Sequence, residues 1–264
     1  MKIVAVQLNS VWENKPATHE KLRAILANDT ITEESLIVFP EMFDTGFSMN
    51  TSATGQSSDL ESERFLQEIA ETYNSAVLAG VAAPTENGQS KNEAVAFAPD
   101  GTELVRYRKM QPFTLTGEDR HYGFGDQHRI FEWCGMKVSP FVCYDLRFPE
   151  VFRPAAQEGA ELIVVMACWP AKRSEHWVRL LQARAIENQA YVVGVNRCGT
   201  EPKFVYDGRS AAFDPHGKAL FEADEAEQVF HLDIDPNVVR DWRDEFPALR
   251  DMRQICAPRG EADA

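Results

Sequence analysis

Regularly spaced cysteines are missing from this sequence. Its 264 residues include five cysteines, an odd number, and no C-x-x-C pair. Disulfide frameworks and zinc sites both depend on paired or regularly spaced cysteines, so the pattern argues against each of them. We therefore expect a cytoplasmic protein with reduced thiols and no bound metal.

Long hydrophobic runs are also missing. The opening MKIVAVQLNSVW is too short an apolar stretch for a secretory signal, which needs roughly 7–15 apolar residues and a small-residue cleavage site. No run approaches the roughly 18 apolar residues that indicate a membrane span. A glycine-rich phosphate-binding loop is absent too. We expect no membrane association, no bound nucleotide and no other cofactor.

Positive charge is scarce. The chain has 27 Lys and Arg against 41 Asp and Glu, which gives a formal net charge of −14. Such a surface repels nucleic acid and anionic lipid, so neither is an expected partner. It also repels small anions at long range. An anionic substrate would need a local pocket of positive charge.

Apolar strand patterns and amphipathic helix patterns alternate along the chain. The expected strands are 2–8, 35–41, 75–83, two within 92–109, 135–143, 160–167, 191–197 and further strands within 208–235. The expected helices are 18–29, 59–74, 149–159, 174–190 and 236–246. This alternation predicts an α/β protein with covered sheets, and the hairpin-like pairs at 92–109 and 208–235 make part of the sheet antiparallel.

The absence of a linker, repeat or low-complexity segment predicts a single domain over residues 1–264, with about 247–264 as a C-terminal tail. Three local details can be predicted as well. Pro140 should lie at a sheet edge or bulge. Pro154 should kink or shorten the helix around it. Ser174 is a candidate N-cap for the helix that follows.

Three chemically distinct side chains follow apolar strands. Glu41 ends the segment LIVFPE, Lys109 ends ELVRYRK, and Cys143 ends SPFVC. Ligands bind at the carboxyl ends of strands in open α/β sheets. A thiol becomes a good nucleophile only when a neighbour accepts its proton. In this reading no histidine lies at a strand end opposite Cys143, so carboxylates and lysines at strand ends are the better candidates for its partners. A Cys–His peptidase stays open as a weaker alternative.

Acidic residues lie near these positions. Taken by itself, Glu118, in TGED, reads as a surface loop acid beside Asp119. Asp145, Arg147 and Glu150 follow the thiol. We expect them to form a buried ion network that braces the turn.

Four parts of the chain carry recognisable motifs: FPEMFDTGF, YRKMQPF with TGED, CYDLRFPEVFR and ARAIENQAYVVGVNR. Together these motifs resemble those of the nitrilase superfamily, the carbon–nitrogen hydrolases. The superfamily's Glu–Lys–Cys order is matched by Glu41, Lys109 and Cys143. The resemblance extends from KIVAVQLN to about residue 245. It implies a four-layer α-β-β-α sandwich, with two mixed sheets face to face and helices outside, which assembles as a homodimer or a higher homo-oligomer.

The resemblance also implies a mechanism without metal or cofactor. Glu41 takes the proton of Cys143, whose thiolate attacks an amide carbon. Lys109 and the backbone N–H of Tyr144 stabilise the resulting oxyanion. Glu118 orients Lys109 or substrate. Ammonia leaves, and water hydrolyses the thioester.

The segment CWPAKRSEHWVRLLQARAIENQAYVVGVNR resembles the ω-amidase branch, which hydrolyses the terminal amide of 2-oxoglutaramate or 2-oxosuccinamate. The resemblance suggests Arg173 and His176 as local positive charge, and Trp169 and Phe43 as pocket walls. Two positions depart from the branch. They are Cys168, where Asn is expected, and Gln111, where His is expected.

Other functions stay open on the sequence alone. Within the same chemistry, a nitrilase or an N-carbamoyl-amino-acid amidohydrolase fits the same residues. A catalytically silent dimeric scaffold is an alternative of another class, although a scaffold has no need to keep all three chemical groups. Cys168 is a candidate second reactive thiol. Cys198 is expected to fill the core, and Cys134 and Cys256 to lie at the periphery.

Overall fold

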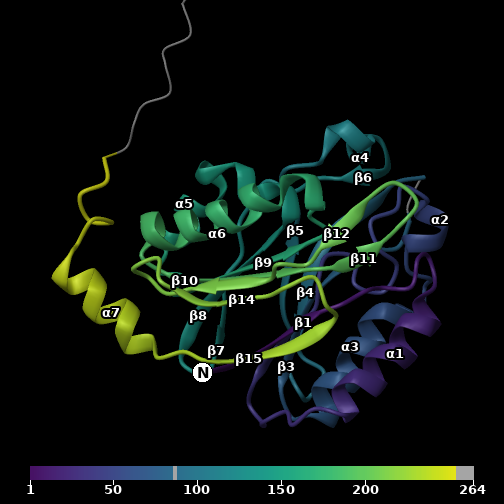
Figure 1. Ribbon diagram of the computed structural model, residues 1–264, viewed down its shortest axis with the longest axis horizontal. Helices are drawn as coiled ribbons and strands as arrows, with labels where there is room; N and C mark the ends of the chain where they lie inside the picture. The colour runs from purple at the N-terminus through teal and green to yellow at the C-terminus, as the bar shows by residue number, and fades with distance from the viewer. Residues whose placement is uncertain (86–87, 254–264) are drawn as a thin grey trace, which may run out of the picture.

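Two β-sheets lie face to face in the computed structural model, which describes residues 1–85 and 88–253 (Figure 1). The strands of the first sheet are β1 (Lys2–Gln7), β2 (Leu36–Val38), β3 (Ala76–Ala82), β4 (Ser90–Phe97), β5 (Glu103–Arg108), β6 (Tyr122–Gly123) and β15 (Gln228–Asp233). Their order is β15-β1-β2-β3-β4-β5, with β6 beside β4. β1, β2 and β3 are parallel, whereas β15, β4 and β5 are antiparallel to their neighbours, so the sheet is mixed.

The second sheet is also mixed. Its strands are β7 (Phe131–Trp133), β8 (Met136–Val142), β9 (Leu162–Ala167), β10 (Tyr191–Asn196), β13 (Ala211–Phe213) and β14 (Ala219–Glu222). The order is β14-β13-β10-β9-β8-β7, and β8, β9 and β10 are parallel. A separate hairpin joins β11 (Cys198–Thr200) to β12 (Val205–Asp207).

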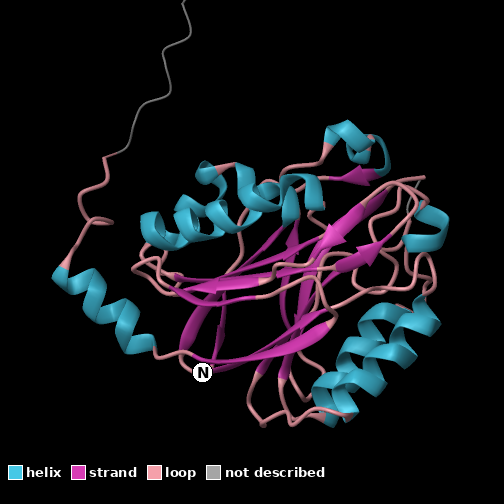
Figure 2. Ribbon diagram, viewed as in Figure 1, coloured by secondary structure: helices cyan, strands magenta, loops and turns pink. Residues whose placement is uncertain are grey.

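Helices cover the outer face of each sheet, which gives the four layers α-β-β-α (Figure 2). The first sheet is covered by α1 (Lys15–Ala27) and α3 (Glu61–Thr72), and the second by α5 (Pro149–Gln157) and α6 (Ser174–Asn188). Two one-turn helices, α2 (Thr51–Thr54) and α4 (Glu118–His121), lie in loops, and α7 (Pro236–Glu245) follows β15. The predicted fold class is confirmed.

Side chains of successive strand residues point alternately to the two faces of each sheet and contribute to two hydrophobic cores. In β1, Ile3 and Ala5 belong to the core between the sheets, whereas Val4 and Val6 belong to the core beneath the helices. All four are at most 1% exposed. Successive strand residues point to opposite faces, so near-continuous apolar strands are what a sheet covered on both faces requires.

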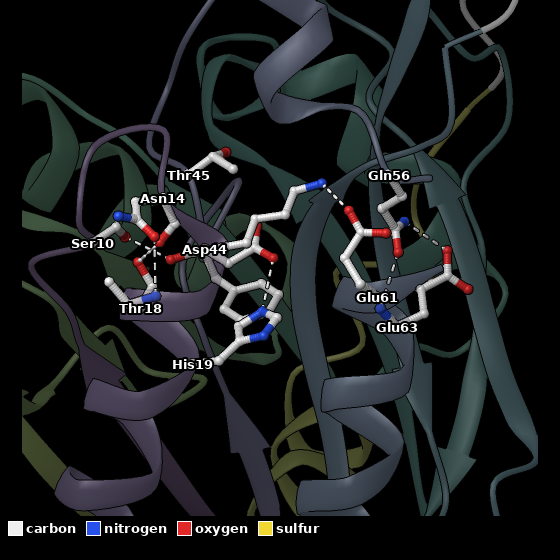
Figure 3. Close-up of polar contacts among 12 residues, drawn as sticks. Ser10, Asn14, Thr18, His19, Asp44, Thr45, Gln56, Glu61 and Glu63 are labelled. Carbon is white, nitrogen blue, oxygen red and sulfur yellow. Dashed lines mark hydrogen bonds and ion pairs between the residues drawn. The ribbon is translucent and has the colours of Figure 1, made fainter. Parts of the chain in front are cut away.

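Polar contacts tie α1 to the neighbouring segments on the outer face (Figure 3). Lys15 Nζ lies 2.6 Å from Glu61 Oε1 of α3. His19 Nε2 lies 3.0 Å from Asp44 Oδ2, and the His19 ring stacks on Phe65 at 4.1 Å between centroids. These contacts fix α1 and α3 beside the loop that carries the residues after β2.

Several local predictions need correction. The helix α5 ends at Gln157, two residues before the predicted end, and contains Pro154 in its interior. Ser174 is the first helical residue of α6 and Arg173 occupies the N-cap position, so the predicted cap is wrong. The segment 208–235 divides between the sheets, because β13 and β14 pair in the second sheet while β15 crosses to β1 in the first.

Other predictions hold or lie outside the described residues. Pro140 falls beyond the stretch of β8 that pairs with β7, so it lies on an edge as predicted. Most of the predicted tail, from residue 254 on, and Cys256 lie outside the described residues. Within 1–85 and 88–253, no helix is long and apolar enough to span a membrane.

Candidate active site

Three strand ends carry the predicted catalytic side chains to one place. Lys109 directly follows β5, Cys143 directly follows β8, and Glu41 lies just after β2. The chain at Glu41 passes close to β3 at Gly80, where an added Cβ would lie 2.5 Å from the Glu41 Cα. Glycine is therefore required at position 80 for this close approach.

Lys109 is held between two buried carboxylates. Its Nζ donates to Glu41 Oε1 at 2.8 Å and to both carboxylate oxygens of Glu118 at 2.9 Å. The three side chains are at most 2% exposed. Burial alone lowers the pKa of Lys109, but the negative charges of Glu118 and Glu41 outweigh it and raise this pKa well above its usual value. The amine is therefore an ammonium, suited to stabilising negative charge rather than to accepting a proton.

Asn92 is a member of this cluster that the sequence reasoning missed. Its Nδ2 donates to Glu41 Oε1 at 2.7 Å and to Glu118 Oε1 at 2.9 Å. It lies near the start of β4, where the first four residues, from Ser90 to Glu93, are all polar. The sequence pattern therefore gave no signal that separated Asn92 from its polar neighbours. One amide thus fixes both carboxylates around the Lys109 ammonium.

Cys143 adopts a left-handed backbone conformation with φ of +48°. This region is uncommon for residues other than glycine, and strain of this kind gathers at active sites. Burial and then the negative charge of Glu41 raise the pKa of the Cys143 thiol well above its usual value, although Lys109 opposes them. A hydrogen bond to Glu41 adds to this effect. The thiol is therefore protonated at rest, with Glu41 next to it.

Asp145 braces the turn after β8, but not through an ion network. Its carboxylate accepts hydrogen bonds from the Val142 N–H at 3.0 Å, the Tyr107 hydroxyl at 2.7 Å and the Gln111 N–H at 2.8 Å. The predicted network with Arg147 and Glu150 is wrong. Glu150 is exposed, and Arg147 contacts Trp169 and His176 instead.

A narrow cavity that is partly open to solvent adjoins these groups. It is lined by Phe47, Phe113, Cys143, Tyr144, Arg147, Cys168, Trp169, Pro170, Arg173, Phe204 and Tyr206. Among the predicted contacts, Trp169 and Arg173 line the cavity. Phe43 does not. It packs in the core beneath the helices, against Phe39 and Phe65, and Phe47 takes the wall position instead.

Two guanidinium groups stand at this cavity. Arg147 lies over the Trp169 ring at 4.8 Å, and Arg173 lies over the Phe113 ring at 5.3 Å. Burial lowers the pKa of Arg147, and repulsion by Arg173 lowers it further. Within the described part of the chain, neither group forms an ion pair with a carboxylate. His176 is exposed and contacts Arg147 at 3.0 Å, so it supports a lining residue without lining the cavity.

Cys168 occupies a position next to Glu41. Its N–H donates to Glu41 Oε2 at 2.8 Å, and its Sγ contacts the Glu41 carbonyl oxygen at 3.2 Å. Cys198 is buried and Cys134 is exposed, as expected. The sequence reasoning also missed a second buried cluster of polar side chains. Arg197 pairs with Glu201 at 2.6 Å, and Glu201 accepts a hydrogen bond from the lining residue Tyr206.

The described residues contain no group of three or more His, Cys, Asp or Glu side chains arranged to hold a metal ion. What they define is an α-β-β-α sandwich in which a thiol, an ammonium and a carboxylate meet at strand ends and a second carboxylate joins them from the one-turn helix α4. The carbon–nitrogen hydrolase family model matches residues 2–244, and the chain belongs to this family, within the nitrilase superfamily.

Known proteins resemble the chain over nearly its whole length. Omega-amidase YafV of Escherichia coli strain K12 is 37% identical over 258 residues, which cover 97% of this chain and 98% of that protein. The 2-oxoglutaramate amidase of Bacillus subtilis strain 168 is 30% identical, with 91% of this chain and 93% of that protein covered.

A solved structure agrees as well. XC1258 from Xanthomonas campestris, a CN-hydrolase superfamily protein with an arsenic adduct in its active site, has a TM-score of 0.90 at 30% identity. The alignment covers 98% of this chain and 99% of that chain.

Proposed function

We propose that this protein hydrolyses the terminal amide of a small carboxylated 2-oxo acid, 2-oxoglutaramate or 2-oxosuccinamate, to the acid and ammonia through a thioester on Cys143. The observation that carries the proposal is the buried ammonium of Lys109 between Glu41 and Glu118, beside Cys143. Relatives named omega-amidase and 2-oxoglutaramate amidase support the choice of substrate.

The first step is a proton transfer. Cys143 is a thiol at rest, and Glu41 is the neighbouring base that hydrogen-bonds to it. Glu41 takes the proton as the sulfur attacks the amide carbon. Its second oxygen stays fixed by the Cys168 N–H, so the carboxylate keeps its orientation during the transfer.

The second requirement is a site for the oxyanion that forms. Lys109 is a fixed ammonium. Tyr144 is the second residue of the short 3₁₀ helix Cys143–Arg147, where backbone N–H groups lack partners within the helix. Both act as donors to the developing negative charge. Removing one such donor from an acyl-transfer enzyme costs about 2.7–4 kcal/mol. Glu118 and Asn92 keep the Lys109 ammonium in position.

Collapse of this intermediate releases ammonia, to which Glu41 returns the proton, and leaves the thioester. Glu41 then accepts a proton from water, and the hydroxide attacks the thioester carbonyl. The acid leaves and Cys143 regains its proton. No step needs a group that the chain does not supply.

The substrate's carboxylate is assigned to Arg147 and Arg173. Two cations that face one small cavity without an ion-pair partner in the described residues favour an anionic ligand. Aromatic walls from Phe47, Phe113 and Trp169 limit the size of that ligand.

The protein is further proposed to act in the cytoplasm as a single-domain homodimer or higher homo-oligomer. Sedimentation of the purified protein should give a mass that is a multiple of the monomer mass of 29.8 kDa. A species of monomer mass at micromolar concentration would contradict self-association.

The test is ammonia release from a panel of small amides, nitriles and N-carbamoyl amino acids, with Cys143→Ala beside the wild type. We expect release from 2-oxo acid amides by the wild type only. A preference for nitriles or N-carbamoyl amino acids would mean that the protein has the activity of another branch of the superfamily. Activity in Cys143→Ala would show that Cys143 is not the nucleophile. Inactivity of the wild type toward the whole panel would favour the catalytically silent scaffold.

A further inference from the structure

Two thiols line one cavity. Cys143 and Cys168 both face it, with 8% and 3% of their surfaces exposed. Of the other described cysteines, Cys134 is exposed beside Glu34, and Cys198 is buried with its Sγ 4.0 Å from the Gln7 carbonyl oxygen. In the part of the chain that the structure describes, these two cysteines are therefore a pair set apart from the rest.

Strand pairing brings the two residues to neighbouring positions. β8 and β9 are parallel neighbours with Val142 opposite Met166, so Cys143 follows β8 opposite Ala167, and Cys168 is one residue further along, just after β9. Neighbouring strands lie about 4.8 Å apart, and disulfides join Cα atoms roughly 4.4–6.8 Å apart. The register therefore brings the pair close to the range that a disulfide spans.

Glu41 contacts both thiols. The Cys168 Sγ lies 3.2 Å from its carbonyl oxygen, and its carboxylate hydrogen-bonds to Cys143. Burial and then the charge of Glu41 raise the pKa of both thiols well above the usual value. Neither is a thiolate at rest, so oxidation at this site needs Glu41 to take the first proton, as amide hydrolysis does.

We propose that Cys143 and Cys168 form a reversible disulfide when the protein meets hydrogen peroxide, a modification that blocks the nucleophile and protects it from irreversible oxidation. Cys168 is the resolving thiol.

The chemistry takes two steps. Glu41 accepts the Cys143 proton while the sulfur attacks one peroxide oxygen; the O–O bond breaks, a sulfenic acid forms, and the other oxygen leaves as water with that proton. The Cys168 sulfur then attacks the Cys143 sulfur, and the sulfenic hydroxyl leaves as water with the Cys168 proton. One peroxide is reduced to two waters while two thiols are oxidised to one disulfide.

The test treats the full chain with hydrogen peroxide and analyses a non-reducing digest by mass spectrometry. We expect one cross-linked peptide pair joining Cys143 to Cys168, which dithiothreitol separates into two free thiols. In Cys168→Ser, peroxide should instead raise the sulfinic and sulfonic forms of Cys143 at least fivefold over wild type. Cys198→Ser, a buried cysteine away from the cavity, should behave like the wild type.

The readout does not depend on any substrate, so a wrong assignment of the reaction would leave this test intact. Oxidised wild type without the Cys143–Cys168 cross-link would overturn the proposal. Equal irreversible oxidation of Cys143 in wild type and Cys168→Ser would overturn it as well.

Discussion

Asn92 shows how much of the site depends on a residue outside the reaction itself. Its amide donates to Glu41 and to Glu118, so it holds two negative charges at a fixed distance around Lys109. Hydrogen bonds to charged groups contribute about 1.5–3 kcal/mol. Asn92 is thus a positioning residue for both carboxylates.

Asn92→Ala should therefore lower kcat by roughly 10–100-fold, because each 1.36 kcal/mol in the barrier is tenfold in rate, and should change KM little. Steady-state ammonia release checks this split. Asn74→Ala is the matched control, since Asn74 also donates its amide to a carboxylate, that of Glu33, but at the surface. A larger change in KM than in kcat would contradict the positioning role.

At the scale of elements, strand ends and the close contacts between strands place the site. Gly80 of β3 is the clearest example, because a Cβ there would lie 2.5 Å from the Glu41 Cα and 3.0 Å from the Met42 N. The chain after β2 approaches β3 closely at Gly80, and this close approach positions the carboxylate of Glu41.

Gly80→Ala should displace Glu41 and lower kcat at least tenfold, because misplacement of a reacting group by about 1 Å can cost a hundredfold. Gly194→Ala is the matched control. Its Cβ would meet Leu181 and Trp177 of α6, at 2.3 and 2.7 Å, and neither is a reacting group. It should therefore lower stability by about 1–3 kcal/mol and leave kcat intact. Ammonia release and urea unfolding measure the two effects, and equal kcat losses would contradict the assignment.

The contact between α1 and α3 predicts a pH dependence of stability. Partial burial tends to raise the pKa of Glu61, but hydrogen bonds from Lys15 and Ser57 outweigh it and lower this pKa to about 2. The unfolded value is near 4.5. The stabilisation is therefore complete above pH 4.5 and is lost as the pH falls toward 2.

Thermal unfolding of Glu61→Gln beside the wild type checks this. The variant should have the lower Tm at pH 6, by a few degrees, and the difference should shrink steadily between pH 4.5 and pH 2. Glu225→Gln, at an exposed position, should show a difference that does not depend on pH. A gap for Glu61→Gln that stays constant down to pH 2 would contradict the pKa shift.

The sequence predicts elements better than it predicts contacts between them. Apolar strand patterns located the strand ends, and Glu41, Lys109 and Cys143 follow such ends, so their meeting could be expected from the edge rule for α/β sheets. Phe43 and Phe47 both follow β2, but only the path of the loop decides which one reaches the cavity. The sequence pattern does not contain that path, and Asn92 is not distinguished in it from its charged neighbours Lys91 and Glu93.

At the scale of the whole molecule, a strongly acidic protein keeps two cations at its cavity. The net charge of −14 opposes small anions, so affinity for one must come from Arg147 and Arg173. Arg173→Gln should raise KM for a carboxylated amide about tenfold and change KM for a neutral amide much less.

Arg179→Gln, on an exposed part of α6, is the control for general charge removal and should leave both KM values within about twofold. Steady-state kinetics on the two amides distinguish an effect of the local charge of Arg173 from an effect of the net charge of the protein. An equal rise in KM for the neutral amide would show that Arg173 does not bind the substrate's carboxylate.

The two sheets matter because they bring an acid, an ammonium and a sulfur, distant in sequence, to one cavity. The most direct measurement of that central claim is rapid acid quenching during turnover of 2-oxoglutaramate, followed by peptide mass spectrometry. The account predicts an adduct on Cys143 with the mass of the substrate less ammonia, and none on Cys143→Ala. Turnover without any adduct at residue 143, or with the adduct on another residue, would contradict it.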